Sequence, residues 1–132
     1  MNVEQVLWPR IVAISPGDAL IDAAWKMREN EISCVLVMSG KELDGIVTER
    51  DLLRAYVDGA SLTSTPVIDY MTRHPRTIEA GTEVTEAAAL MMRTATRHLP
   101  VVKAGRLIGM VSSRDLLAVL AGRPMLFRAA GA

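Results

Sequence analysis

The chain has few of the residues that mark secreted or membrane proteins. One of its 132 residues is cysteine, and aromatic residues make up 4%. A single cysteine excludes an internal disulfide and fits a reducing compartment. The longest apolar runs, CVLVM (34–38) and LLAVLA (116–121), are far shorter than the roughly 20 residues that span a bilayer. The start, MNVEQVLWPR, lacks the basic and apolar regions of a signal peptide. We therefore expect a cytoplasmic protein with no membrane segment.

The sequence also has little of what catalysis and nucleic-acid binding need. Its histidines are His74 and His98, its one cysteine is Cys34, and none has the spacing of a metal site. Cys34 begins an apolar run, which favours a packed small side chain, and His74 lies in a Pro-bounded loop that favours exposure. The net charge of zero argues against general nucleic-acid binding. We expect no enzyme, no metal and no obligatory cofactor.

The dominant positive feature is an internal repeat. Sliding the chain by 64 positions aligns residues 14–53 with 78–117 without a gap, and 13 of these 40 positions are identical. GIVTERDLL (45–53) recurs as GMVSSRDLL (109–117). Self-similarity on this scale indicates a duplicated structural unit.

Each copy predicts the same order of elements. Residues 15–30 and 79–94 have apolar residues at helical spacing, with Asp18 and Thr82 as N-caps and the methionines 27, 91 and 92 in the core. Two short β-type runs joined by a turn follow, which predicts an antiparallel hairpin. RDLLRAYVDG and RDLLAVLAG then predict short helices that stop at Gly59 and Gly122.

With a short strand before the first helix (IVAI, and RTI in the second copy), each copy reads β-α-β-β-α. We predict an α+β (α/β-like) fold in which the two units pack sheet to sheet with pseudo-twofold symmetry. The predicted boundaries are repeat 1 at 3–57, a linker at 58–66, repeat 2 at 67–122 and a tail at 123–132. The tail contains Phe127, and either disorder or docking on a neighbouring subunit would fit it.

The most informative motif is the T/S-x-x-D element that opens the last helix of each copy. Thr48 with Asp51, and Ser112 with Asp115, have the spacing of a capping box, in which hydroxyl and acid satisfy backbone amides at the helix start. The same helix start also suits phosphate, and an acid there can accept hydrogen bonds from ribose hydroxyls. Both roles can coexist because capping uses only part of what a carboxylate can accept.

These motifs, together with RHLPVV (97–102) and VIDYMTRHP (67–75), resemble a cystathionine-β-synthase (CBS) domain pair, or Bateman module, over residues 3–121. The resemblance implies a cleft between the repeats that binds adenosine nucleotides or S-adenosylmethionine. It implies that the Asp of each copy holds ribose hydroxyls, the Thr or Ser assists, and an apolar strand residue lies against the base. The ligand-binding residues implied are Ile46, Thr48, Arg50, Asp51, Met110, Ser112, Arg114, Asp115, Ser33, Cys34, Arg97, His98, Pro9 and Arg73.

The two implied sites differ where the hairpins begin. Ser33 in the first copy aligns with Arg97 in the second, and Cys34 aligns with His98. Residues 1–66 have 6 basic and 10 acidic residues, a net charge of −4, and residues 67–132 have 9 and 5, a net charge of +4. This asymmetry is either chance variation, a basic lining for anions, or attraction between opposite halves of two chains. We expect the site lined by Arg97 and His98 to prefer ligands with more phosphate.

The resemblance also implies a homodimer formed through the helices, for which Leu116, Leu117 and Leu120 are candidates, and the opposite charges favour a head-to-tail arrangement. The leading functional interpretation is a stand-alone regulatory module that senses an adenine nucleotide (AMP, ADP, ATP or S-adenosylmethionine-like) and acts on an unidentified partner protein. The alternative is a protein–protein interaction module with empty or degenerate nucleotide sites.

Overall fold

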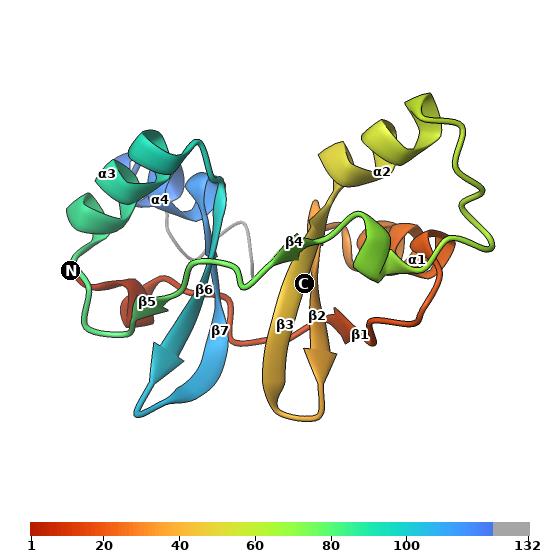
Figure 1. Ribbon diagram of the computed structural model, residues 1–132. Coiled ribbons are helices and arrows are strands. Elements are labelled where there is room, and N and C mark those ends of the chain that lie inside the picture. The colour runs from red at the N-terminus through yellow and green to blue at the C-terminus, as the bar shows by residue number, and fades with distance from the viewer. Residues whose placement is uncertain (123–132) are drawn as a thin grey trace. The chain divides into compact units, whose positions relative to one another are not determined.

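The order β-α-β-β-α predicted for each repeat is confirmed by the computed structural model, which describes residues 1–122 (Figure 1). The first repeat contains β1 (Ala13–Ile14), α1 (Leu20–Asn30), β2 (Cys34–Ser39), β3 (Glu42–Thr48) and α2 (Glu49–Val57). The second contains β5 (Ile78–Glu79), α3 (Val84–Thr94), β6 (His98–Lys103), β7 (Arg106–Ser112) and α4 (Ser113–Leu120). The predicted tail, with Phe127, lies outside the described residues.

Both predicted hairpins form, and each is preceded by a short parallel strand. β2 pairs antiparallel with β3, and β6 with β7, while β1 and β5 lie parallel to β2 and β6. The predicted helix stops are also confirmed: Gly59 (φ +80°) and Gly122 (φ +75°) follow α2 and α4 directly after their C-caps. A left-handed residue at this position ends a helix, and glycine adopts it without a steric penalty.

The predicted N-caps of the two longer helices are wrong by one residue. The caps are Ala19 and Glu83, and neither side chain makes a capping hydrogen bond. Asp18 instead accepts a hydrogen bond from the N–H of Ser15 at 2.9 Å. The backbone of Thr82 bonds elsewhere, because its carbonyl accepts from the N–H of Val3 at 2.8 Å. The Asp18 side chain therefore closes a local turn before α1 instead of capping the helix.

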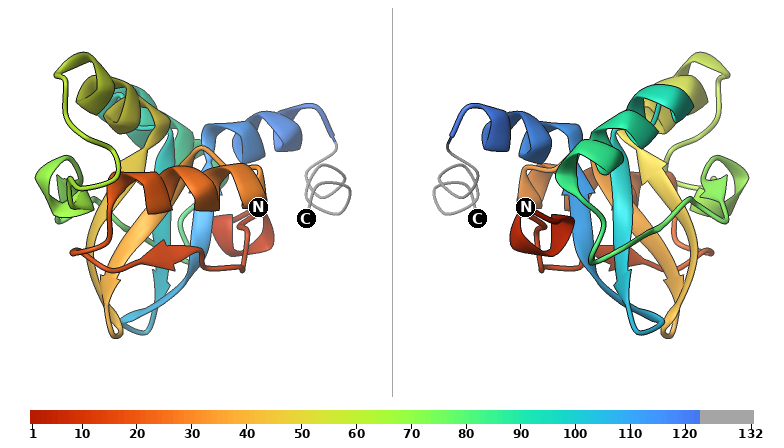
Figure 2. Two further views of the ribbon diagram at one scale, coloured as in Figure 1. Left: turned by 90° about the vertical axis from the view of Figure 1, so that its right-hand side faces the viewer. Right: turned by 90° about the vertical axis from the view of Figure 1, so that its left-hand side faces the viewer.

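Each sheet is covered on one face by the helices of its own repeat. Figure 2 shows α1 lying across the first sheet in its left view and α3 across the second in its right view. In the first repeat, Val35, Val37 and Val47 project from β2 and β3 into a core with residues of α1 and α2. Leu99, Val101 and Val111 do the same in the second repeat. Since side chains alternate along a strand, the residues between them lie on the opposite face of each sheet.

The compact units do not coincide with the repeats as they run along the chain. One unit, here called the first-repeat unit, is Val12–Pro75. The other, the second-repeat unit, joins Met1–Ile11 to the chain from Arg76 onward. Each unit therefore contains a segment that precedes the opposite repeat in sequence. We call residues 1–11 and 66–75 the crossing segments.

The two crossing segments have equivalent structures 64 positions apart. Each begins with a short 3-10 helix, η1 (Val3–Gln5) or η2 (Val67–Asp69), whose first valine is fully buried. Residues 72–73 form β4 (Thr72–Arg73), which pairs with β3. Trp8 forms the matching bridge to Met110 of β7. The crossing segment thus adds the last strand position to the sheet of each unit (Figure 1).

Candidate functional site

The first-repeat unit has a capping box at the start of α2. The Asp51 Oδ2 atom accepts hydrogen bonds from the N–H of Thr48 at 2.8 Å and from its Oγ1 at 3.1 Å. Thr48 Oγ1 in turn accepts the N–H of Asp51 at 3.3 Å. Asp51 is 8% exposed, so a carboxylate is nearly buried where a strand ends and a helix begins. The capping interpretation is confirmed for this copy.

The second-repeat unit repeats this geometry at the start of α4. Asp115 Oδ2 accepts from the N–H of Ser112 at 2.7 Å and from its Oγ at 3.0 Å. The Ser112 Oγ atom accepts the N–H of Asp115 at 3.2 Å. Asp115 is 5% exposed and Ser112 is 8% exposed. Two acids at helix N-termini, where the macrodipole favours negative charge, are thus held alike in the two units.

The hairpin residues named in the sequence lie beside these helix starts. Cys34 pairs in register with Thr48, and His98 with Ser112. The residue before each accepts a helix amide: the Ser33 carbonyl accepts from Glu49 at 3.0 Å, as the Arg97 carbonyl does from Ser113 at 2.9 Å. Because Glu49 and Asp51 already use their amides, α2 offers a ligand fewer N–H groups than an uncapped helix start.

The crossing segments place Arg73 in the first-repeat unit and Pro9 in the second-repeat unit. Arg73 pairs with Gly45 on β3, so it lies beside the first-repeat motif. Trp8, the residue before Pro9, exchanges backbone hydrogen bonds of 2.8 and 3.1 Å with Met110, so Pro9 lies beside the second-repeat motif. The sequence predicted that both residues lie near a site, but it did not show which crossing segment packs with which repeat.

The remaining predicted residues differ in accessibility. Ile46 and Cys34 are buried, at 7% and 6% exposure, on the sheet face opposite α1 and α2. Met110 and His98 are half-buried on the corresponding face of the second sheet. The three arginines beside the motifs are exposed: Arg50, Arg97 and Arg114.

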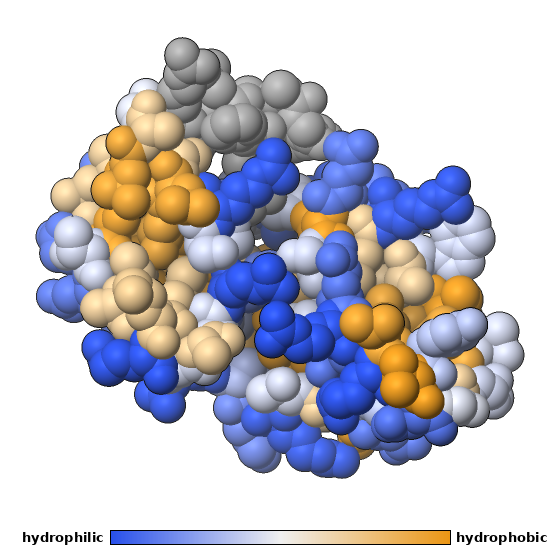
Figure 3. Space-filling view, turned by 90° about the horizontal axis from the view of Figure 1, so that it is seen from above, coloured by the Kyte–Doolittle hydropathy of each residue, from blue (hydrophilic) through white to orange (hydrophobic). Residues whose placement is uncertain are grey.

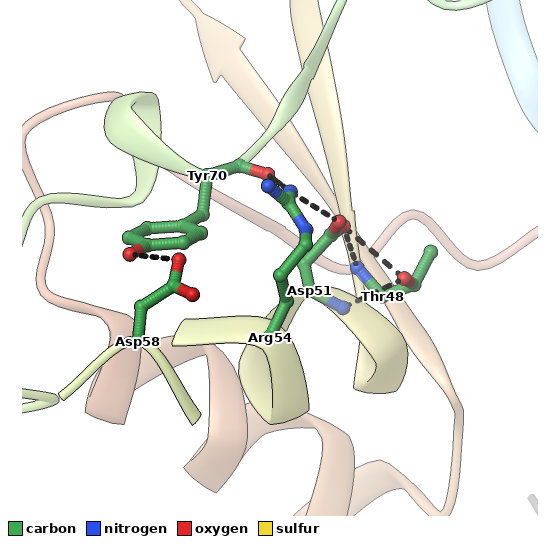
Figure 4. A network of polar contacts seen from close by, with 5 residues as sticks. All are labelled: Thr48, Asp51, Arg54, Asp58 and Tyr70. Atoms are coloured by element: carbon green, nitrogen blue, oxygen red, sulfur yellow. Dashed lines mark hydrogen bonds and ion pairs between the residues drawn. The ribbon is translucent and has the colours of Figure 1, made fainter. Parts of the chain in front are cut away.

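One group of residues at the first motif was missed by the sequence analysis. The Arg54 Nη2 atom donates to Asp51 Oδ1 at 3.1 Å and to the Tyr70 carbonyl at 3.0 Å (Figure 4). The Arg54 guanidinium also lies 5.1 Å from the centroid of the Tyr70 ring. The Tyr70 hydroxyl donates to Asp58 at 2.9 Å, and this bond raises the pKa of Tyr70 above its ordinary value. The repeat does not indicate this group, because Arg54, Asp58 and Tyr70 are not shared between the copies.

Other kinds of site find little support within residues 1–122. No three His, Cys, Asp or Glu side chains of this range come together where they could hold a metal ion. No helix in the same range is long and apolar enough to cross a membrane. Cys34 is buried and His74 is exposed, as the sequence predicts.

Two α+β units related by duplication, each with a hydroxyl and a buried acid at the start of its last helix, define the class of this protein. The CBS domain family model matches residues 3–58 and 67–122. The chain belongs to the CBS domain family and contains a pair of these domains.

Relatives found by sequence comparison support this assignment to the family. The chain is 36% identical over 121 residues to the uncharacterized 17.7 kDa protein in the bps2 3′ region of Acidianus ambivalens, covering 90% of this chain and 73% of that protein. Three other curated relatives are longer, and the chain spans 62%, 21% and 52% of them.

Two solved structures show the likeness in three dimensions. A putative signal-transduction protein with CBS domains from Burkholderia ambifaria is 34% identical, with a TM-score of 0.89 over 92% of this chain and 95% of that one. The CBS domain protein PAE2072 from Pyrobaculum aerophilum, complexed with AMP, is 26% identical, with a TM-score of 0.82 over 92% of this chain and 99% of that one.

Proposed function

We propose that this chain is a regulatory module that binds an adenine nucleotide, or an S-adenosylmethionine-like ligand, at its two matched motifs. The observation that carries the proposal is the pair of nearly buried carboxylates, Asp51 and Asp115, held in the same way at two helix starts. A carboxylate that is fixed and nearly dehydrated makes strong hydrogen bonds to the hydroxyls of a ribose. The AMP complex of the Pyrobaculum relative supports this ligand class.

Each site then has parts with separate tasks. The acid and its neighbouring hydroxyl hold the ribose, and Ile46 or Met110 lies against the base. In the second-repeat unit, Arg97 and His98 add a charged fork and an imidazole for phosphate, so this site prefers ligands with more phosphate. Signalling requires the ligand to bind one arrangement of the protein better than another, which changes the activity of a partner protein.

Thermal unfolding with added nucleotide tests the proposal. Millimolar AMP, ADP or ATP is expected to raise the melting temperature, because a ligand at 100 times its dissociation constant stabilises by about 2.7 kcal/mol. For a domain of this size that is about 10 °C. Asp51→Asn and Asp115→Asn each keep an oxygen that can cap the helix but lose the charge, so each is expected to lose its site's share of the shift.

Ligand shifts are compared with each variant's own unliganded melting temperature, since the capping role of the acids changes stability by itself. A wild-type protein whose melting temperature responds to none of these nucleotides, nor to S-adenosylmethionine, contradicts the proposal and favours an interaction module with empty sites.

A homodimer is the second part of the proposal, and exposed apolar side chains support it. Apolar and aromatic residues lie on the outer faces of α2 and α4, including Leu53 (63% exposed), Tyr56 (72%), Leu117 (64%) and Leu120 (80%). Leu53 and Leu117, like Tyr56 and Leu120, occupy equivalent repeat positions. Figure 3 shows apolar side chains gathered over α4 at the upper left and over α2 at the lower right. Matched exposed patches are typical of interaction surfaces.

The structure corrects one of the residues expected at this interface. Leu116 is 5% exposed and belongs to the core of the second-repeat unit, because its place on α4 faces the sheet. Leu117 and Leu120 remain candidates.

Sedimentation velocity tests the dimer. The double variant Leu53→Lys with Leu117→Lys is expected to sediment as a monomer at concentrations where the wild type is a dimer, because four charges would enter the apolar contact. Met92→Lys on α3 is a matched control, since Met92 is 85% exposed and lies on neither helix. A monomeric wild type, or a double variant that still dimerises, contradicts this part of the proposal.

A further inference from the structure

Arg54 connects the acid of the first motif to the crossing segment of the same unit. One nitrogen, Nη2, donates both to Asp51 Oδ1 at 3.1 Å and to the backbone carbonyl of Tyr70 at 3.0 Å. The guanidinium lies over the ring of Tyr70, and the ring's hydroxyl is fixed by Asp58 (Figure 4). Tyr70 is three residues before Arg73, which pairs with β3 beside the motif.

The residues that make this connection are not repeated at the second motif. The positions 64 residues from Arg54, Tyr70 and Asp58 are Ala118, Val6 and Gly122. None of these has a side chain that can donate a hydrogen bond, stack on a ring as a cation, or accept a hydrogen bond from a hydroxyl. The duplication therefore provides an internal comparison, in which one motif has an arginine bridge and the other has alanine in its place.

Neither helix capping nor surface charge explains the bridge. Ser112 and Asp115 form the same capping box, with bonds of 2.7 to 3.2 Å, although Ala118 stands at the position equivalent to Arg54. The Arg54 side chain is 55% exposed, and ion pairs so open to water contribute little to stability. What the bridge does fix is the direction of Asp51 Oδ1, the oxygen that the capping box does not use.

We propose that Arg54 is a positioning residue for the ribose site of the first repeat, and this rests on the proposed function above. By bonding one side of Oδ1, Arg54 holds the carboxylate in the orientation that presents its remaining acceptor capacity to a ribose diol. By bonding Tyr70, it holds Arg73 and the edge of the same site in place. A site ordered before the ligand arrives loses less entropy on binding, so the bridge strengthens the selection for the 2′ and 3′ hydroxyls at the first-repeat site.

Calorimetry with two nucleotides tests this role. AMP and 2′,3′-dideoxy-AMP differ in the hydroxyls that Asp51 would hold, and the Asp115→Asn background silences the second-repeat site. Adding Arg54→Ala is expected to weaken AMP binding about tenfold, the scale of one charge-assisted hydrogen bond. Binding of the dideoxy nucleotide should change much less. Arg54→Lys, which keeps the charge but cannot bridge and stack at once, should restore only part of the preference for AMP.

The ratio of the two affinities separates positioning from a general loss of structure, because partial unfolding weakens both nucleotides equally. Arg28→Ala is the matched control: Arg28 stacks on Trp25 on α1, with 5.5 Å to the ring centroid, and should leave the ratio unchanged.

The other possible outcomes contradict either the role of Arg54 or the proposed function. Equal loss for both nucleotides, no loss for AMP, or a changed ratio in Arg28→Ala overturns the role of Arg54 alone. A protein that has its second motif intact and still binds no AMP overturns the proposed function, and the role of Arg54 falls with it.

Discussion

A chain that begins at residue 12 is expected to lose the cooperative fold of its second-repeat unit, although all of the second repeat is still present. Three residues of the missing crossing segment fill the core of that unit: Val3 is 0% exposed, Val6 is 2% and Leu7 is 9%. Burying each contributes about 1.5–3 kcal/mol, so the loss of all three removes roughly 4.5–9 kcal/mol. That is comparable with the whole free energy of unfolding of a small domain, about 5–15 kcal/mol.

The truncated chain also loses backbone pairing that no other segment can supply. The N–H and carbonyl of Trp8 no longer pair with Met110, and the N–H of Val3 no longer bonds to Thr82. Urea denaturation followed by circular dichroism, with amide NMR spectra to separate the units, measures the effect. Peptide 1–11 added in trans is expected to restore the missing signals, since it provides the same side chains.

Two neighbouring residues give a matched pair of point variants in the full chain. Val3→Asp puts a charge into a fully buried position and should destabilise the second-repeat unit strongly. Glu4→Gln removes only the exposed ion pair with Lys103, which lies at 2.7 Å, and should change the free energy of unfolding by less than about 1 kcal/mol. A truncated chain as stable as the full one would show that the crossing segment does not belong to this core.

The sequence predicted what is local and repeated. The hairpins, the glycine stops and the two capping boxes depend on residues within a few positions of each other, and the duplication showed each signal twice. Met27 and Met91 are core residues, as helical spacing predicts, but the next residue, Met92, is 85% exposed. Adjacent residues on a helix point about 100° apart, so Met91 and Met92 cannot both face the core.

The sequence could not predict the crossing of the segments, because both copies present equivalent side chains. Val3 and Val67 are the same residue in the same local structure, and each is fully buried. The hydrophobic periodicity does not show which of the two valines is buried in which core. The Arg54 bridge was missed for a related reason: it depends on how far a long side chain reaches toward Tyr70, 16 residues away in sequence. Features present in only one copy of a duplicated unit cannot be found by comparing the two copies.

The second large effect is expected at Gly109, where the crossing segment lies directly on β7. A Cβ atom at this position would overlap the carbonyl oxygen of Trp8 and would lie 2.8 Å from Leu7 Cδ1 and 3.2 Å from Pro9 Cα. Backbone atoms on two of the three sides cannot rotate away as a flexible side chain can. Gly109→Ala must therefore push residues 7–9 off the strand, at a cost of about 1–3 kcal/mol from overpacking.

A second glycine of the same unit is the control. A methyl group added at Gly81 would have no atom within 4 Å, so Gly81→Ala should be neutral or slightly stabilising by restricting the unfolded chain. Thermal unfolding of both variants measures the contrast, which is expected to reach about 5–10 °C. Because Pro9 lies against Gly109 and Trp8 pairs with Met110, Gly109→Ala should also weaken nucleotide binding at the second-repeat motif more than at the first.

Gly45→Ala extends the same test to the other unit. There the added methyl group would lie 2.5 Å from Met71 Sδ and 2.7 Å from the carbonyl oxygen of Thr72. The thioether can move aside but the carbonyl cannot, so the loss of stability should be real but smaller than at Gly109. If both alanine variants unfold at the wild-type temperature, the close approach of the crossing segments to the strands is contradicted. If Gly109→Ala and Gly45→Ala are destabilised and Gly81→Ala is not, the glycine of each repeated motif is explained by the backbone that crosses it.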